Sequence, residues 1–126
     1  MELLDTISPF LDDLAGGSAT PGGGSAAAAS GAMGAALVSM VCNLTIGRKK
    51  FANVDREMRT VLERSEALRT ELTQLVSDDA VAFAAIMDAF KLPKSTYEEK
   101  SVRRIAIQEG TKQATLTPLA TARACG

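Results

Sequence analysis

Hydrophobic residues recur at helical spacing along most of the chain. The first helix is predicted near the N-terminus, where five apolar residues form one stripe: Leu4, Ile7, Phe10, Leu11 and Leu14. Either Thr6 or Ser8 can serve as its N-cap, and Gly16 and Gly17 should end it.

A longer pattern runs from Phe51 to Phe90. Its seam alternates by three and four residues for more than five heptads, without Pro or Gly, through Phe51, Val54, Met58, Val61, Ser65, Leu68, Leu72, Leu75, Asp79, Ala82, Ile86 and Ala89. Only Ser65 and Asp79 are polar. A helix of this length spans ~55–60 Å, which is more than two short neighbours can cover. We therefore expect chains to associate through these helices.

Residues 91–94 interrupt this pattern, and a fourth helix is predicted after them. Residues 95–99 offer overlapping capping boxes for its start. Pro118 lies in its interior, where it removes one hydrogen bond of the helix ladder and should kink the helix. Because no strand-like alternation of useful length occurs, the sequence predicts a single all-α domain over residues 1–126, a helical bundle with one long central helix.

The stretch between Asp13 and Arg48 has no charged residue and holds eight of the ten glycines. A helix from Ala26 to Ile46 would be long enough to cross a bilayer, which takes ~20 residues. Its composition is mostly Ala, Gly and Ser, so insertion would gain little free energy. We expect a buried helix of a soluble protein, packed closely through small residues on adjoining faces: Ala27, Ser30, Gly31, Gly34 and Ala35.

The amino-acid composition limits the kinds of partner, cellular setting and metal site that we expect for this chain. The net charge of −1 gives no general attraction to nucleic acid or to an anionic membrane. Cys42 and Cys125 are isolated thiols, which favours a reducing, cytoplasmic setting. The chain has no histidine, so it lacks the commonest general base and the commonest metal ligand. We therefore expect no metal site.

Candidate ligand-binding residues lie at both ends of the uncharged stretch. At its start, Pro21, Gly22, Gly23, Gly24 and Ser25 form a turn in which Ser25 can cap the next helix. The unpaired amides of that first turn attract a carbonyl or an anion. At its end, Gly47 precedes three cations, Arg48, Lys49 and Lys50. These three cations either complement a helix C-terminus or anchor an anion.

Asp79 is the candidate catalytic residue, because a carboxylate on an apolar seam is desolvated. Desolvation raises the pKa of a carboxyl group and suits it to proton transfer, or to stabilising a nearby cation. Two structural alternatives stay open. Asp79 could pair with a buried Lys or Arg, or the heptad could be offset so that Ala80 and Phe83 face the core.

Several segments resemble, in order, the formiminotetrahydrofolate cyclodeaminase and methenyltetrahydrofolate cyclohydrolase family. They are Pro21-Gly-Gly-Gly-Ser-Ala-Ala-Ala-Ala29, Gly31–Leu37, Met40–Phe51, Asp78-Asp-Ala-Val-Ala-Phe83, Lys91–Lys94, Ile107–Glu109 and Thr117–Leu119. Family members are usually longer at the C-terminus, so the resemblance implies a C-terminally truncated domain.

The resemblance implies folate one-carbon chemistry by acid/base catalysis at the N5/N10 bridge, as a cyclohydrolase or a cyclodeaminase. The substrate would be a tetrahydrofolate derivative, and the reaction would require no metal and no redox cofactor. Asp79 would be the acid/base or cation stabiliser, residues 21–25 the amide cradle, and Arg48, Lys49 and Lys50 the anchor of a glutamate or polyglutamate tail. Asn43 would bind a pterin edge or satisfy a neighbouring backbone group. The expected assembly is a homodimer or a higher homo-oligomer. The alternative is a catalytically inert helical assembly module or fragment.

Overall fold

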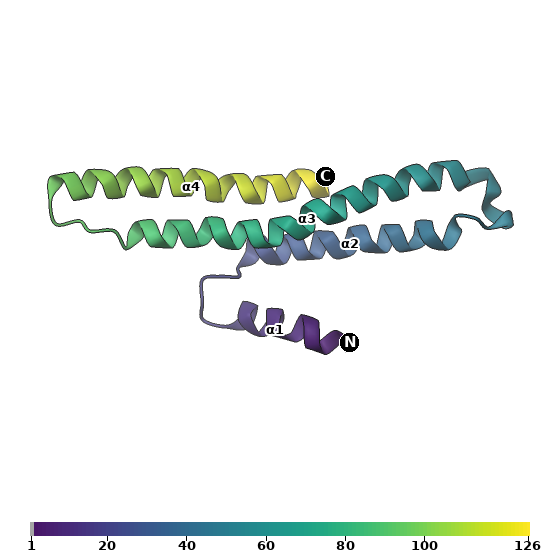
Figure 1. Ribbon diagram of the computed structural model, residues 1–126, viewed down its shortest axis with the longest axis horizontal. Coiled ribbons are helices and arrows are strands. Elements are labelled where there is room, and N and C mark those ends of the chain that lie inside the picture. Colours follow the sequence, from purple (N-terminus) through teal and green to yellow (C-terminus); the bar gives the residue numbers. More distant parts are fainter. Residues whose placement is uncertain (1) are drawn as a thin grey trace.

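The computed structural model describes residues 2–126 and is all-α over that range, as predicted. Four α-helices and one 3₁₀ segment follow one another: α1 (Leu3–Ala15), α2 (Gly23–Thr45), η1 (Lys49–Val54), α3 (Asp55–Phe90) and α4 (Tyr97–Cys125). Helix α3 runs antiparallel to α2 and to α4, and α1 lies apart from this layer (Figure 1). The long central helix of the prediction is therefore α3.

Helix ends match the sequence signals at some positions and not at others. Gly16 is the C-cap of α1, but α1 starts at Leu3, so Thr6 and Ser8 lie inside the helix and neither is its N-cap. The Thr6 hydroxyl instead donates to the Leu3 carbonyl at 2.9 Å. At α4 the predicted capping box is present, with the Thr96 side chain accepting from the Glu99 amide at 3.1 Å.

The apolar seam of α3 is covered within the chain. The seam residues from Val54 to Ala89 are all buried or half-buried. Helix α2 covers the N-terminal part of α3 and α4 covers the C-terminal part (Figure 1). The expectation that this seam lacks cover within one chain was wrong, because the neighbouring helices α2 and α4 have 23 and 29 residues rather than being short.

Helix α2 packs on α3 through a narrow face of small residues. This face differs from the predicted one, since Ala27, Ser30 and Gly34 are exposed. Its members recur three or four apart and are Ser25, Ala28, Ala32, Ala35, Ser39 and Cys42. Gly31 does make a close contact as expected: a Cβ there would lie 2.9 Å from the Cys125 sulfur. Small side chains let the two helix backbones approach closely.

The other face of α2 is apolar and exposed, which the sequence reading did not anticipate. Large side chains there, each about half exposed, are Met33, Leu37, Met40, Val41 and Leu44. Within residues 2–126, α2 is the one helix long and apolar enough to cross a membrane, with a mean hydropathy of 1.5 in its most apolar window and 28% of that window buried. Helix α2 is thus buried on one side only.

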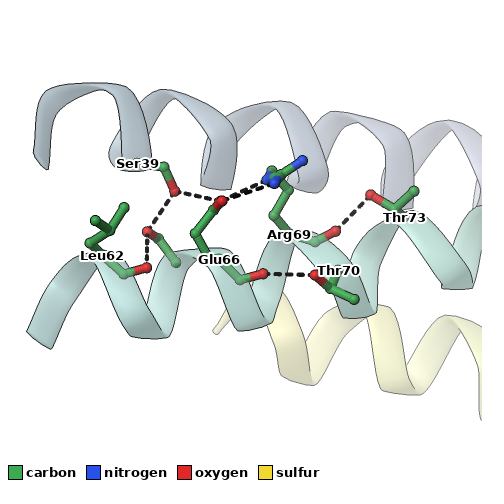
Figure 2. A network of polar contacts seen from close by, with 7 residues as sticks. Ser39, Leu62, Glu66, Arg69, Thr70 and Thr73 are labelled. Atoms are coloured by element: carbon green, nitrogen blue, oxygen red, sulfur yellow. Dashed lines mark hydrogen bonds and ion pairs between the residues drawn. The ribbon is translucent and has the colours of Figure 1, made fainter. Parts of the chain in front are cut away.

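A polar network closes the middle of the α2–α3 interface (Figure 2). The buried hydroxyls of Ser39 and Ser65 lie 2.8 Å apart, and the Ser39 hydroxyl donates to Glu66 at 2.9 Å. Arg69 donates to the same Glu66 carboxylate at 2.7 Å. Hydrogen bonds from Arg69 and then Ser39 lower the pKa of Glu66 from 4.5 to about 2. Ser65, one of the two polar seam residues, therefore has a structural role as a hydrogen-bonded residue of the α2–α3 interface.

Candidate functional site

The glycine turn ends with free amide donors. Helix α2 begins at Gly23 with Gly22 as its N-cap, and its first backbone hydrogen bond runs from the Ala26 amide to the Gly22 carbonyl at 3.1 Å. The amides of Gly23, Gly24 and Ser25 precede that bond, so they have no acceptor within the helix. They form the positive end of a 23-residue helix, a site that favours an anion or a carbonyl oxygen.

Asp79 faces this turn from α3. A Cβ built on Gly24 would fall onto the Asp79 carboxylate, in contact with both carboxylate oxygens and the carboxyl carbon. Only a glycine at position 24 lets the first turn of α2 come this close to Asp79. Asp79 is half-buried, and it makes no hydrogen bond or ion pair with any other side chain among residues 2–126. The structure thus brings together two elements that the sequence singled out separately.

A pocket of about 350 Å³ opens where the turn and Asp79 meet. Residues from the turn, α3 and α4 line it: Ala19, Gly22, Gly23, Gly24, Asp79, Phe83, Ala114 and Pro118. Its size lies within the ~300–1,000 Å³ usual for small-molecule sites. The polar groups, amide donors and one carboxylate, are set among apolar walls. Such a site can hold a ligand that places a positive charge beside Asp79 and a carbonyl or anionic group at the amides.

Sequence reasoning missed four wall residues, Ala19, Phe83, Ala114 and Pro118. Phe83 was considered only as an alternative core residue, although it lies one helical turn after Asp79 and so shares its face of α3. Ala114 and Pro118 are likewise one turn apart on α4. The sequence singled out Pro118 as an interior proline, but it does not show that Ala114 and Pro118 line a pocket, because that depends on how α4 packs against α3.

Ser25 has a different role from the one expected. Its side chain is completely buried, and its hydroxyl donates to the Val76 carbonyl of α3 at 2.8 Å. The prediction that Ser25 caps the helix was wrong, because the helix begins two residues earlier at Gly23. Because the hydroxyl is used in this way, Ser25 can offer a ligand only its backbone amide, beside the free amides of Gly23 and Gly24. Pro21 is half-buried, follows a cis peptide bond from Thr20, and does not line the pocket.

The basic run lies at the opposite end of α2. Arg48, Lys49 and Lys50 are exposed, and the length of α2 places them about 33 Å from the glycine turn at 1.5 Å per residue. Asn43, also exposed, lies near that same end. Within one chain, therefore, these four residues do not join the Asp79 pocket.

The turn that holds the basic run is built by its own contacts. Gly47 adopts a φ of 81°, in the left-handed region that glycine tolerates. Its amide donates to the Asp55 carboxylate at 2.8 Å. The hydrogen bond from the Gly47 amide, followed by one from the Arg59 side chain, lowers the pKa of Asp55. The Lys50 ammonium lies 5.5 Å from the centre of the Phe51 ring, a cation–π contact.

The fold and the pocket define an all-α domain with one carboxylate facing a helix N-terminus. Residues 6–126 match the profile of the formiminotransferase-cyclodeaminase family. The chain belongs to that family.

Curated relatives and a solved structure agree with the family assignment. The chain is 59% identical, over 96% of its length, to methenyltetrahydrofolate cyclohydrolase of Methylorubrum extorquens, and covers 58% of that protein. It is 49% identical to formimidoyltransferase-cyclodeaminase of Mus musculus, over 93% of this chain and 22% of that protein. The crystal structure of formiminotetrahydrofolate cyclodeaminase from Thermotoga maritima superposes with a TM-score of 0.77 at 33% identity, over 94% of this chain and 55% of that one.

Proposed function

We propose that this chain provides the active site of a folate one-carbon enzyme, a methenyltetrahydrofolate cyclohydrolase. The observation that supports this most directly is the apposition of Asp79 and the free amides of the α2 first turn in one pocket. The 59% identity to a cyclohydrolase favours that activity. Because the chain spans about 58% of that relative, the activity of the whole protein is part of the proposal.

The reaction needs one base, one acid and a place for a delocalised cation. In 5,10-methenyltetrahydrofolate the positive charge is shared by N5, the bridging carbon and N10. Asp79 would stabilise this cation and take a proton from the attacking water as the carbon–oxygen bond forms. The tetrahedral carbon then loses its bond to N5, which takes up the proton held by Asp79, while the new hydroxyl group gives up its proton to solvent and becomes the formyl C=O. The products are 10-formyltetrahydrofolate and one proton. Phe83 and Pro118 would exclude water from the other side of the ring.

A cyclodeaminase is the second candidate, favoured by the superposition on the Thermotoga maritima enzyme. In that reaction N10 attacks the formimino carbon of 5-formiminotetrahydrofolate, and ammonia leaves with the proton that N10 gives up. The same carboxylate could move that proton. The two reactions differ in the leaving group, which the pocket residues do not specify.

The proposal extends to the substrate tail, assembly and location. Arg48, Lys49 and Lys50 would bind a polyglutamate tail, supported by their charge but set about 33 Å from the pocket along α2. A homodimer is proposed because a second copy of the chain would cover the exposed apolar face of α2. A cytoplasmic location is proposed as well. Sedimentation of the chain as a 13.2 kDa monomer at micromolar concentration would count against the dimer.

The experiment that tests the proposed function follows the methenyl chromophore with the purified chain. A cyclohydrolase makes its absorbance disappear faster than buffer does. A cyclodeaminase makes the absorbance appear from 5-formiminotetrahydrofolate, with one ammonium ion released per turnover. If neither rate exceeds the buffer rate, this polypeptide by itself is an inert helical module rather than an enzyme.

A further inference from the structure

Pro118 leaves a backbone acceptor free inside α4. The helix continues through Pro118 without interruption, from Tyr97 to Cys125. A proline has no N–H, so it cannot donate to the carbonyl four residues earlier, and the Ala114 carbonyl loses its regular helical partner. The nearby threonine hydroxyls do not replace it. Those of Thr115 and Thr117 donate to Thr111 and Gln113 instead.

The residues at both ends of this missing hydrogen bond line the Asp79 pocket. Ala114 and Pro118 both line that pocket, together with Gly23 and Gly24 from the turn. In an α-helix the carbonyl of one residue points along the axis toward the residue four positions later, so the Ala114 oxygen lies between two wall residues. This placement sets a backbone acceptor beside the pocket on the α4 side, while the backbone donors lie on the α2 side.

This arrangement matches the edge of a pterin ring. The ring carries an amino group at C2 and an N–H at N3, both donors, next to the C4 carbonyl, which is an acceptor. We propose that the Ala114 carbonyl, exposed by Pro118, accepts a hydrogen bond from the amino edge of the pterin and so orients the folate. The inference rests on the proposed function, since it assigns a contact within the same site.

Two substitutions remove the free acceptor. Pro118→Ala and Pro118→Val both restore an N–H that can donate to the Ala114 carbonyl, and valine also keeps most of the apolar bulk of proline. The probe is 5-formyltetrahydrofolate, a stable reduced folate. We expect both variants to bind it roughly fivefold more weakly, the scale of one lost hydrogen bond. Both should also melt at a higher temperature than the parent chain, because the helix ladder is then complete.

Matched controls separate this role from simple packing. Pro9 is also inside a helix, α1, but does not line the pocket. Pro9→Ala should leave folate binding unchanged. An analogue with a methyl group in place of the C2 amino group should bind the parent and both Pro118 variants equally, because the lost donor no longer distinguishes them.

Each result decides the question. If Pro118→Val binds the folate as tightly as the parent while Pro118→Ala does not, the proline is a wall and the inference is wrong. Unchanged affinity or an unchanged melting temperature in both variants also overturns it, since the carbonyl was then either unused or already bonded. If the parent chain binds no reduced folate, the proposed function fails, and this inference fails with it.

Discussion

The two polar residues of the α3 seam, Ser65 and Asp79, lie two heptads apart on the same face and have opposite surroundings. Ser65 is buried and bonds to the Ser39 hydroxyl of α2 at 2.8 Å. Asp79 is half-buried, contacts the backbone of Gly24 and lines a pocket. The two surroundings differ because of the α2 residue that lies opposite, which is Ser39 for Ser65 and Gly24 for Asp79.

The comparison shows how to separate a structural polar residue from a functional one. Opposite Ser65, α2 supplies a hydroxyl, so the polar group is satisfied inside the interface. Opposite Asp79, α2 supplies a glycine, so the carboxylate has no side-chain hydrogen-bond partner and borders the pocket. A charged group left without a side-chain partner beside free amides is available to a ligand.

The largest effect should come from Asp79→Asn. The amide keeps the size of the side chain but removes the negative charge and the titrating proton. Turnover should fall by ~10²-fold or more, while the affinity for the folate changes little. Steady-state kinetics with 5,10-methenyltetrahydrofolate measures both quantities.

Ser65→Ala is the matched control on the same seam. It should lower the free energy of unfolding by about 1 kcal/mol through the lost hydrogen bond, with turnover per folded molecule unchanged. Parent-like turnover in Asp79→Asn would show that both seam residues are structural.

The next effect concerns the contact between Gly24 and Asp79. In Gly24→Ala the new methyl group would occupy the position of the carboxylate, so the Asp79 side chain must move. A displacement of this kind should reduce kcat roughly ten- to a hundredfold. Gly23→Ala makes the same change one residue away, where a Cβ meets nothing within 4 Å. Because both variants gain the same helix propensity, equal kcat values would exclude a special role for Gly24.

Local patterns were sufficient to predict most of the fold. The heptad of α3 identified its buried face, and the overlapping capping boxes at residues 95–99 identified the start of α4, where the Thr96 and Glu99 box is the one that forms. The sequence could not predict which side of α2 faces α3. Alanine, glycine and serine occur on every side of that helix, so composition gives no preferred face.

The site was predictable only in part, for a similar reason. Asp79 and the glycines stand out because a carboxylate interrupts an apolar seam and because three consecutive glycines precede a helical segment. The basic run was attractive by charge alone, but the length of a helix separates it from the pocket, and spacing along the sequence does not reveal that separation. Pro118 itself marks the loss of one helix hydrogen bond, but which side of α4 lines the pocket depends on a tertiary contact that the sequence does not reveal.

The smallest effect should be the pH dependence that Glu66 adds to stability beside Ser65. Arg69 and Ser39 hold the pKa of Glu66 at about 2, below its ordinary value of 4.5. A carboxyl group whose pKa is lowered by folding stabilises the native state above its unfolded pKa and loses that contribution as the pH falls toward its folded pKa. Glu66→Gln should therefore be less stable than the parent near pH 7, and the gap should narrow steadily between about pH 5 and pH 2. Urea unfolding of both chains across this range measures the gap.

Glu63→Gln, an exposed change three residues away on α3, is the control and should show a smaller gap at every pH. A gap for Glu66→Gln that stays constant with pH would mean that the Ser39, Ser65 and Glu66 network does not depend on the charge of the carboxylate. The seam around Ser65 would then be held by packing and neutral hydrogen bonds alone, which would sharpen its contrast with the charged site at Asp79.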